Sequence, residues 1–229
     1  MIAFPLIATL VSTIFATQLL TTWTHRRQLS HLAWGIAMTM FAVASLAVTA
    51  GVGGGWDPTL FRVYWLFGAV LNVPYLALGS VALLGKRRLT VLTLLLVVAA
   101  TLIAVVAVAV ATAHFPASAL KNIPRGSAVW GKGQLVAQLG RYMSIPAYLI
   151  VLLIAVGSSR GGRLPVARIR GNWLIAIGAT ITATGGPMAR YGRGSVFSVL
   201  LATGVTVMFI GFRLSTRVGR PPAPANEPQ

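Results

Sequence analysis

The sequence predicts an all-α, polytopic transmembrane helix bundle, and two features of its composition carry that prediction. The 229 residues are 56% hydrophobic and only 9% charged, whereas a soluble domain has about 25% charged residues to wet its surface. Apolar runs long enough to cross a hydrocarbon core about 30 Å thick as helices follow one another along almost the whole chain. They leave no room for a soluble domain.

Seven spans are predicted, separated by loops. Their expected bounds are residues 2–22, 31–50, 58–84, 89–113, 134–156, 172–189 and 195–212. Ser30 is expected to cap the second span and Gly51 to follow its end. The longest loop, residues 114–133, is expected to lie on the membrane face. The spans form one domain, residues 1–213, and residues 214–229 are expected to be a disordered, proline-rich tail.

The basic residues set the predicted orientation. Twelve flank the spans on one side: Arg26, Arg27, Lys86, Arg87, Arg88, Arg160, Arg163, Arg168, Arg170, Arg213, Arg217 and Arg220. Seven flank the other side: Arg62, Lys121, Arg125, Lys132, Arg141, Arg190 and Arg193. The positive-inside rule places the richer side in the cytoplasm, so we expect the N-terminus outside and the tail inside. Because these flanking loops carry the net charge of +17, we do not expect nucleic-acid binding.

The sequence lacks the side chains that most catalytic sites need. Its acids are Asp57 and Glu227, and Glu227 lies in the tail, so paired-carboxylate chemistry is excluded. There is no cysteine, and His25, His31 and His114 do not have the spacing of metal ligands on a helix. We therefore expect no catalytic residues, no metal and no cofactor.

Asp57 is the only acid near a predicted span. Asp57 and Pro58 form a helix start, with aspartate as the N-cap and proline at the first helical position. Such a cap contributes about 1 kcal/mol to stability. The carboxylate is also a candidate partner for an arginine on the same side of the membrane, and Arg62, Arg141 and Arg190 are equally placed by the sequence.

These three arginines, with Arg193, begin or end different spans on the side predicted to lie outside. One interpretation is that each anchors its helix, with the guanidinium reaching the headgroups as interfacial arginines do. The other is that together they form a basic mouth with too few acids to balance it. Such a mouth would attract an anion, because arginine binds carboxylate and phosphate in bidentate fashion.

Asn72 is predicted near mid-membrane, ten residues beyond Arg62, where an amide facing lipid would be costly. It is therefore expected to face the bundle. There it would either make an interhelical hydrogen bond of about 0.6 kcal/mol or line a polar cavity. Pro74 would contribute to such a cavity by freeing the carbonyl of Val70, and Pro146 would free that of Tyr142.

Two other spans have distinctive patterns. The span at 89–113 is almost wholly aliphatic and is expected at the lipid-exposed periphery. The span at 172–189 has two faces of small residues, made by Ala176, Thr180 and Thr184 and by Gly178, Thr182 and Gly186. These faces predict close helix neighbours on both sides. Gly185-Gly186-Pro187 is expected to break this span near its end, which also fits a broken helix lining a site.

The stretch Gly55–Gly79, GWDPTLFRVYWLFGAVLNVPYLALG, resembles part of a group of uncharacterised multi-span membrane proteins of actinobacteria. The chain is also faintly similar to the seven-span sensor modules of some bacterial histidine kinases, although no kinase part follows in this sequence. The resemblance implies about seven spans and a bacterial inner membrane. It implies no catalytic or binding residues.

The favoured hypothesis is a non-catalytic membrane module that binds an anionic lipid or amphiphile at its outer face or serves as a subunit of a membrane complex. Its candidate ligand-binding residues are Asp57, Arg62, Asn72, Arg141 and Arg190, and its expected partners are the bilayer, a membrane protein or a second copy of the chain. The alternative is a small-solute transporter or channel. A membrane enzyme is least favoured, since only Asp57 and His114 remain as general bases.

Overall fold

The computed structural model describes residues 2–115, 123–131, 133–160, 166–190 and 194–217. This part of the chain is all-helical and contains no strand. Its elements are α1 (Ala3–Arg26), α2 (Leu29–Gly54), α3 (Pro58–Tyr64), the π-helix η1 (Trp65–Leu71), α4 (Asn72–Ala82), α5 (Arg87–Val110), α6 (Gly126–Val129), α7 (Leu135–Arg160), α8 (Val166–Arg190) and α9 (Gly194–Arg217). The tail predicted from residue 214 is wrong at its start, because α9 continues to Arg217, and residues 218–229 lie outside the described part.

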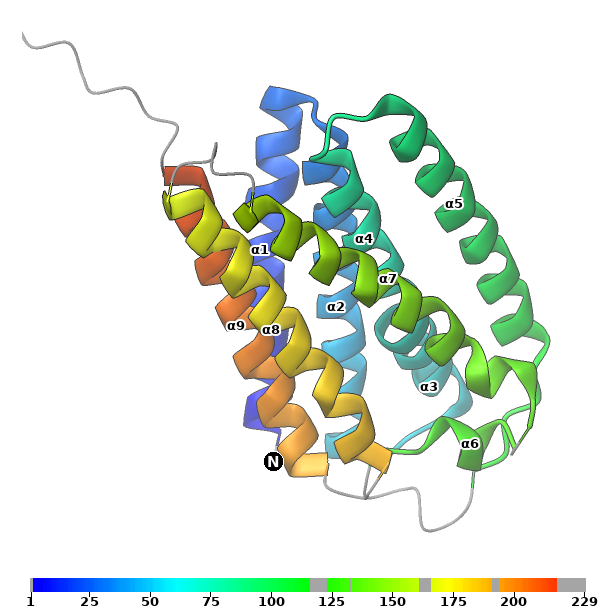
Figure 1. Cartoon of the computed structure of the whole chain (residues 1–229). Helices are drawn as coiled ribbons and strands as arrows, with labels where there is room; N and C mark the ends of the chain where they lie inside the picture. Colours follow the sequence, from blue (N-terminus) through cyan, green and yellow to red (C-terminus); the bar gives the residue numbers. More distant parts are fainter. Residues whose placement is uncertain (1, 116–122, 132, 161–165, 191–193, 218–229) are drawn as a thin grey trace, which may run out of the picture.

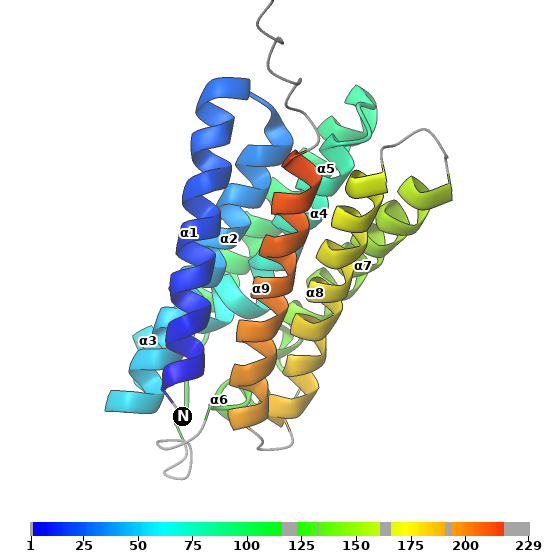
Figure 2. The same ribbon diagram turned by 90° about the vertical axis from the view of Figure 1, so that its left-hand side faces the viewer.

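The long helices alternate in direction, and their contacts close a ring (Figure 1). In this ring α1 packs on α2, α2 on α4, α4 on α7, α7 on α8, α8 on α9, and α9 returns to α1. Figure 2 shows α9 beside both α1 and α8. We call the end of the bundle where α1 begins and α6 lies the Asp57 end.

Within the described ranges, six helices are long and apolar enough to cross a membrane: α1, α2, the continuous helix from Pro58 to Ala82, α5, α7 and α9. The predicted span at 172–189 corresponds to α8, which is not among the six. Its threonines and glycines make it less apolar than its neighbours, although it runs beside α9 along the bundle (Figure 1). The prediction of a multi-pass helical membrane protein therefore agrees with the structure, which has six candidate spans among the described residues. The seventh span stays a prediction.

The predicted ends of the second span are wrong. Its helix α2 begins at Leu29 after Gln28, whose backbone is extended, so Ser30 lies inside the helix and is buried. Gly51 also lies inside α2, and the helix ends instead at Gly55, with a φ of 101° that favours glycine. The apolar periodicity therefore located the helix correctly but not the turns that close it.

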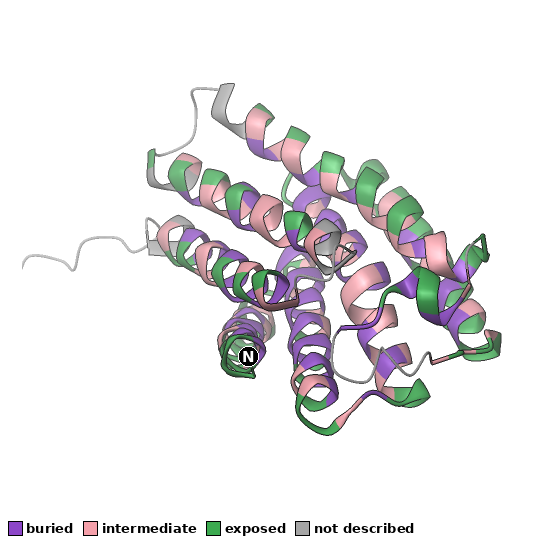
Figure 3. Cartoon of the chain, turned by 90° about the horizontal axis from the view of Figure 1, so that it is seen from below, coloured by how far each residue is buried: buried purple, intermediate pink, exposed green. Residues whose placement is uncertain are grey.

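Helix α5 is peripheral, as its aliphatic composition predicts. Only 17% of its candidate span is buried, against 56% for α2. It packs outside the ring against α4, η1 and α7. Figure 3, seen from the Asp57 end, shows α2 mostly as buried residues and the outer helices with exposed faces. With aliphatic side chains around most of its circumference, α5 suits contact with lipid tails.

The two small faces of α8 meet neighbours on both sides, as predicted. On one face, a Cβ added to Gly178 would lie 2.5 Å from the carbonyl oxygen of Gly204 on α9. On the other, the Thr180 hydroxyl lies 2.8 Å from the Tyr148 hydroxyl of α7. The expected break at Gly185-Gly186-Pro187 does not occur, because α8 continues to Arg190. Gly185 lies against Phe197 of α9, so the last turn of α8 packs on α9.

Replacing Gly178 with alanine is expected to destabilise the protein by about 1–3 kcal/mol, because the methyl group must push apart the backbones of α8 and α9. Thermal unfolding in nanodiscs would measure the loss. Gly157→Ala on α7 is the matched control, since a Cβ there meets no atom within 4 Å and alanine is the better helix former. A Gly178→Ala variant as stable as the Gly157→Ala variant would contradict the close approach.

Candidate functional site

Asp57 is the N-cap of α3, as predicted. Its Oδ1 accepts hydrogen bonds from the backbone N–H groups of Thr59 and Leu60 at 2.7 and 3.0 Å. Pro58 occupies the first turn, where its missing N–H needs no partner. The carboxylate is exposed, and no ion pair to it occurs among the described residues. The structure thus supports the cap and not the predicted pairing with an arginine.

Arg62 is fixed by a backbone carbonyl rather than extended freely to the headgroups. Its Nη2 donates to the carbonyl oxygen of Ala111 at 2.9 Å. Ala111 is the C-cap of α5, so a guanidinium charge lies at the negative end of that helix dipole. Arg62 therefore ties the end of peripheral α5 to α3. Its Nε is buried and has no acceptor among the described residues.

A cluster of aromatic rings surrounds Phe61, beside Arg62. We call it the Phe61 cluster, and its members besides Phe61 are Trp56, Tyr64, Trp65, Phe115 and Trp130. Their ring centroids lie 5.5–6.1 Å from that of Phe61. Trp130, which the sequence placed in a loop on the membrane face, is fully buried here. The sequence reasoning missed this cluster, although its tryptophans adjoin the ends of predicted spans.

Glycines make room for two of these indoles. The Trp56 ring occupies the space that a side chain at Gly51 would need, and the Trp65 ring does the same at Gly126. The Trp65 Nε1 donates to the carbonyl oxygen of Val136 on α7 at 3.0 Å. By contrast, the Nε1 atoms of Trp56 and Trp130 are buried without an acceptor. Each such donor costs about 1–3 kcal/mol if it is left unpaired.

The middle of the third candidate span is a π-helix, η1, which the sequence did not predict. In a π-helix the N–H partner of a carbonyl lies five residues later. For Ala69 in η1 that partner is Pro74, which has no N–H. The Ser144 hydroxyl on α7 donates to the Ala69 oxygen instead, at 3.0 Å. The hydroxyl thus reaches the carbonyl next to that of Val70, and the freeing of Val70 by Pro74 stays a prediction.

Asn72, directly after η1, is buried with 4% of its surface exposed, as predicted for a residue facing the bundle. Its Oδ1 has no hydrogen-bond partner in the part of the chain that the structure describes. The expected interhelical hydrogen bond to this atom is therefore not formed. A buried amide oxygen without a donor is a candidate contact for a polar molecule inside the bundle.

The five predicted site residues are not brought together by any hydrogen bond or ion pair among the described residues. Asp57 and Arg62 share α3 but have different partners, and Asn72 lies deeper along the same span. Arg141 is exposed on α7. Arg190 ends α8, and the orientation of its side chain lies outside the described part. The described bonds do not join these residues, and a basic mouth shared by the three arginines stays a prediction.

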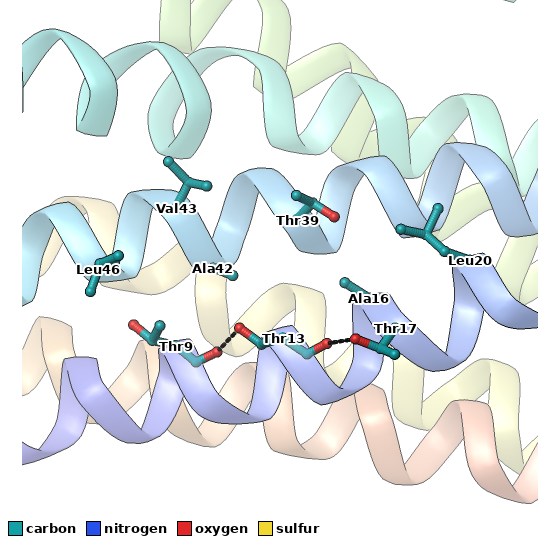
Figure 4. Close-up of a pocket in the computed structure, with 9 residues that line it drawn as sticks. All are labelled: Thr9, Thr13, Ala16, Thr17, Leu20, Thr39, Ala42, Val43 and Leu46. Carbon is teal, nitrogen blue, oxygen red and sulfur yellow. Dashed lines mark hydrogen bonds between the residues drawn. The ribbon is translucent and has the colours of Figure 1, made fainter.

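A groove of about 330 Å³ runs between α1 and α2 (Figure 4). It is lined by Thr9, Thr13, Ala16, Thr17, Leu20, Thr39, Ala42, Val43 and Leu46. Each of its threonine hydroxyls donates to the carbonyl four residues earlier in its own helix, at 2.7–2.9 Å. The hydroxyl protons are thereby used within α1 and α2, so these side chains could meet a ligand only as acceptors.

Comparison with protein families, curated proteins and solved structures finds no match to this chain. Any function must therefore be argued from the residues themselves, since a helical fold alone is compatible with many activities.

Replacing Asp57 with alanine is expected to destabilise the protein by about 1 kcal/mol, because the first N–H groups of α3 lose their acceptor. Asp57→Asn should stay close to the wild type, since asparagine caps helices equally well. Thermal unfolding of the two variants in the same nanodiscs separates the cap from a charge effect. If both variants lost the same stability, the negative charge and not the cap would be the important feature of Asp57.

Proposed function

We propose that this chain is a non-catalytic, multi-pass membrane module that binds an anionic lipid or amphiphile at the Asp57 end of its bundle. The observation that carries this proposal is Arg141, an exposed guanidinium with no hydrogen bond or ion pair among the described residues. The single carboxylate in the described part of the chain has its Oδ1 committed to the cap of α3. The Asp57 end therefore has a positive charge that no described acid neutralises.

The surroundings of Arg141 suit a lipid headgroup. Its neighbour Tyr142 is exposed and donates its hydroxyl proton to Gln138 at 2.8 Å. Further along α7, Ile145 and Leu149 are about half exposed, which suits contact with acyl chains. A cation and a tyrosine followed by aliphatic side chains is the order expected from the headgroup region into the hydrocarbon. An anionic headgroup would give Arg141 the acceptor that the protein does not supply.

The proposal includes the orientation and the setting predicted above. In it α8 is the seventh span, supported by its antiparallel course beside α9 (Figure 2). The Asp57 end faces outward and the arginine-rich end faces the cytoplasm, as the positive-inside rule favours. The setting is a bacterial cytoplasmic membrane. Participation in a larger membrane complex, or as a homo-oligomer, stays a prediction for which the exposed face of α5 offers room.

Arg141→Gln is expected to reduce the amount of phosphatidylglycerol that co-purifies with the protein, by roughly tenfold in apparent affinity for one lost charge-assisted contact. Native mass spectrometry of protein released from mixed micelles would count the bound lipids. Arg87→Gln, at the opposite end of the bundle, removes the same charge as a matched control. An equal loss in both variants would indicate diffuse charge attraction and would contradict a site at Arg141.

A second candidate function, a small-solute transporter, is favoured by one observation. The unpaired Oδ1 of Asn72 directly follows the π-helix η1 inside a candidate span. Single π-helical turns occur frequently at functional sites, and irregular backbone in a membrane is tolerated where it lines a cavity or packs on protein. In this function Asn72 would contact a passing solute.

The variant Asn72→Leu tests whether Asn72 contacts a passing solute or is only a buried amide without a partner. It is expected to raise the free energy of unfolding by about 1–3 kcal/mol, because a buried oxygen without a partner is removed. In a transporter it would also abolish solute flux in proteoliposomes. Ser80→Ala is the control, since its hydroxyl already donates to Leu76 at 2.9 Å. Wild-type flux no greater than in protein-free vesicles across a broad solute panel would rule out the transporter.

A further inference from the structure

Three buried N–H donors in and beside the Phe61 cluster have no acceptor among the residues that the structure describes. They are Nε1 of Trp56, Nε1 of Trp130 and Nε of Arg62. The two indole rings lie 6.1 and 5.5 Å from the ring of Phe61, and Arg62 is the next residue along α3. Because all three atoms only donate, none of them can satisfy another.

Several acceptors of the described residues at this end of the bundle already have a partner. The Oδ1 of Asp57 accepts from two amides of its own helix. The Ala111 carbonyl accepts from the Nη2 of Arg62, and the Val136 carbonyl accepts from Trp65. Phenylalanine rings supply no acceptor oxygen. Among the described residues, none of these three donors is bonded to an acceptor, which leaves room for one from a bound molecule.

The donors also indicate the chemistry of that acceptor. Two indoles and a guanidinium together favour an oxygen with negative charge, because charge-assisted hydrogen bonds are the stronger ones. A phosphate group presents several acceptor oxygens, which suits donors carried by three separate side chains. Trp56 precedes α3 and Trp130 ends α6, so the donors adjoin helix ends, where headgroups lie, rather than the middle of a span.

We propose that the Phe61 cluster binds a phosphate group through Trp56, Trp130 and Arg62. The inference deepens the proposed function, because it names the chemical group recognised at the Asp57 end. It also adds two tryptophans to the candidate site and gives Arg62 a second role beside its contact with Ala111. The source of the phosphate is either a lipid headgroup or a soluble phosphate, and the experiment below separates the two.

The test observes the indole N–H groups directly by NMR, using protein labelled with ¹⁵N-tryptophan in maltoside micelles, which contain no phosphate. The chain has six tryptophans, and single Trp→Phe variants assign their resonances. Phosphatidylglycerol, inorganic phosphate and a neutral diacylglycerol are titrated separately. Trp34 and Trp65 serve as internal references, because their Nε1 atoms already donate to Leu76 and Val136 at 3.0 Å.

The expected result is a saturable downfield shift of the Trp56 and Trp130 indole protons with phosphatidylglycerol, while Trp34 and Trp65 stay in place. A shift with inorganic phosphate as well would identify phosphate itself as the ligand, and a shift with the lipid alone would identify a headgroup. Diacylglycerol should have no effect. If the Trp56 and Trp130 resonances moved with no phosphate compound, or moved equally with diacylglycerol, the proposal would be overturned.

Variants test the donors one at a time. Trp130→Phe keeps an aromatic ring against Phe61 but removes the N–H, and we expect about tenfold weaker phosphate binding. Trp56→Phe should have the same effect and provides an independent variant if Trp130→Phe folds poorly. Trp34→Phe is the matched control, because its donor has a protein acceptor and it is not a member of the Phe61 cluster. It should lower stability but leave the phosphate affinity unchanged, and an equal loss of affinity in all three variants would contradict the assignment.

The same data separate this inference from the function on which it rests. Lipid retention that depends on Arg141 while the Trp56 and Trp130 resonances stay fixed would overturn the phosphate site and leave interfacial lipid binding in place. Indole shifts with phosphatidylglycerol and unchanged lipid retention in Arg141→Gln would do the reverse. In that case the Phe61 cluster would be the lipid-binding site, and Arg141 would take no part in lipid binding.

Discussion

Backbone hydrogen bonding inside a membrane is the constraint on which the rest of this structure depends. No water is present in the hydrocarbon to satisfy an N–H or a carbonyl, so every segment that crosses it must be helical or must find partners elsewhere in the protein. The third candidate span contains Pro74, which removes one donor. The same span contains the π-helix η1, just before Asn72. There the Ser144 hydroxyl of α7 donates to the carbonyl of Ala69. The hydrogen bond from Ser144 also joins α7 to this span.

Between helices in lipid, close packing provides the attraction that the hydrophobic effect cannot provide. Small residues let α8 and α9 approach until their backbones touch, as at Gly178 and Gly204. Tryptophan rings use glycine in the same way, with Trp34 over Gly79, Trp56 over Gly51 and Trp65 over Gly126. The indoles of Trp34 and Trp65 also donate to backbone carbonyls of a neighbouring helix or segment. Against this pattern, the unpaired donors of Trp56 and Trp130 are exceptions that call for a partner.

The arginines at the Asp57 end differ in their roles because they differ in their acceptors. Arg62 has a carbonyl acceptor at the end of α5 and so holds a peripheral helix in place. Arg141 has no acceptor among the described residues and faces the surroundings of the bundle. A chain with 19 basic and two acidic residues cannot neutralise its own charge by ion pairs. Anionic groups from the membrane are the natural complement, and backbone carbonyls serve where a guanidinium is held inside.

The sequence by itself determined the features that depend on solvent or on near neighbours in the chain. Its apolar runs located the helices because partitioning into hydrocarbon depends on composition. Asp57 and Pro58 specified a helix start because a cap bonds only two or three residues away, and the cost of exposing an amide placed Asn72 inside the bundle. Tertiary structure decided the partners. Arg62 meets a carbonyl 49 residues away and Ser144 meets one 75 residues away, while Trp130 is buried against Phe61. No local pattern encodes such pairs, because they form only when distant helices have packed.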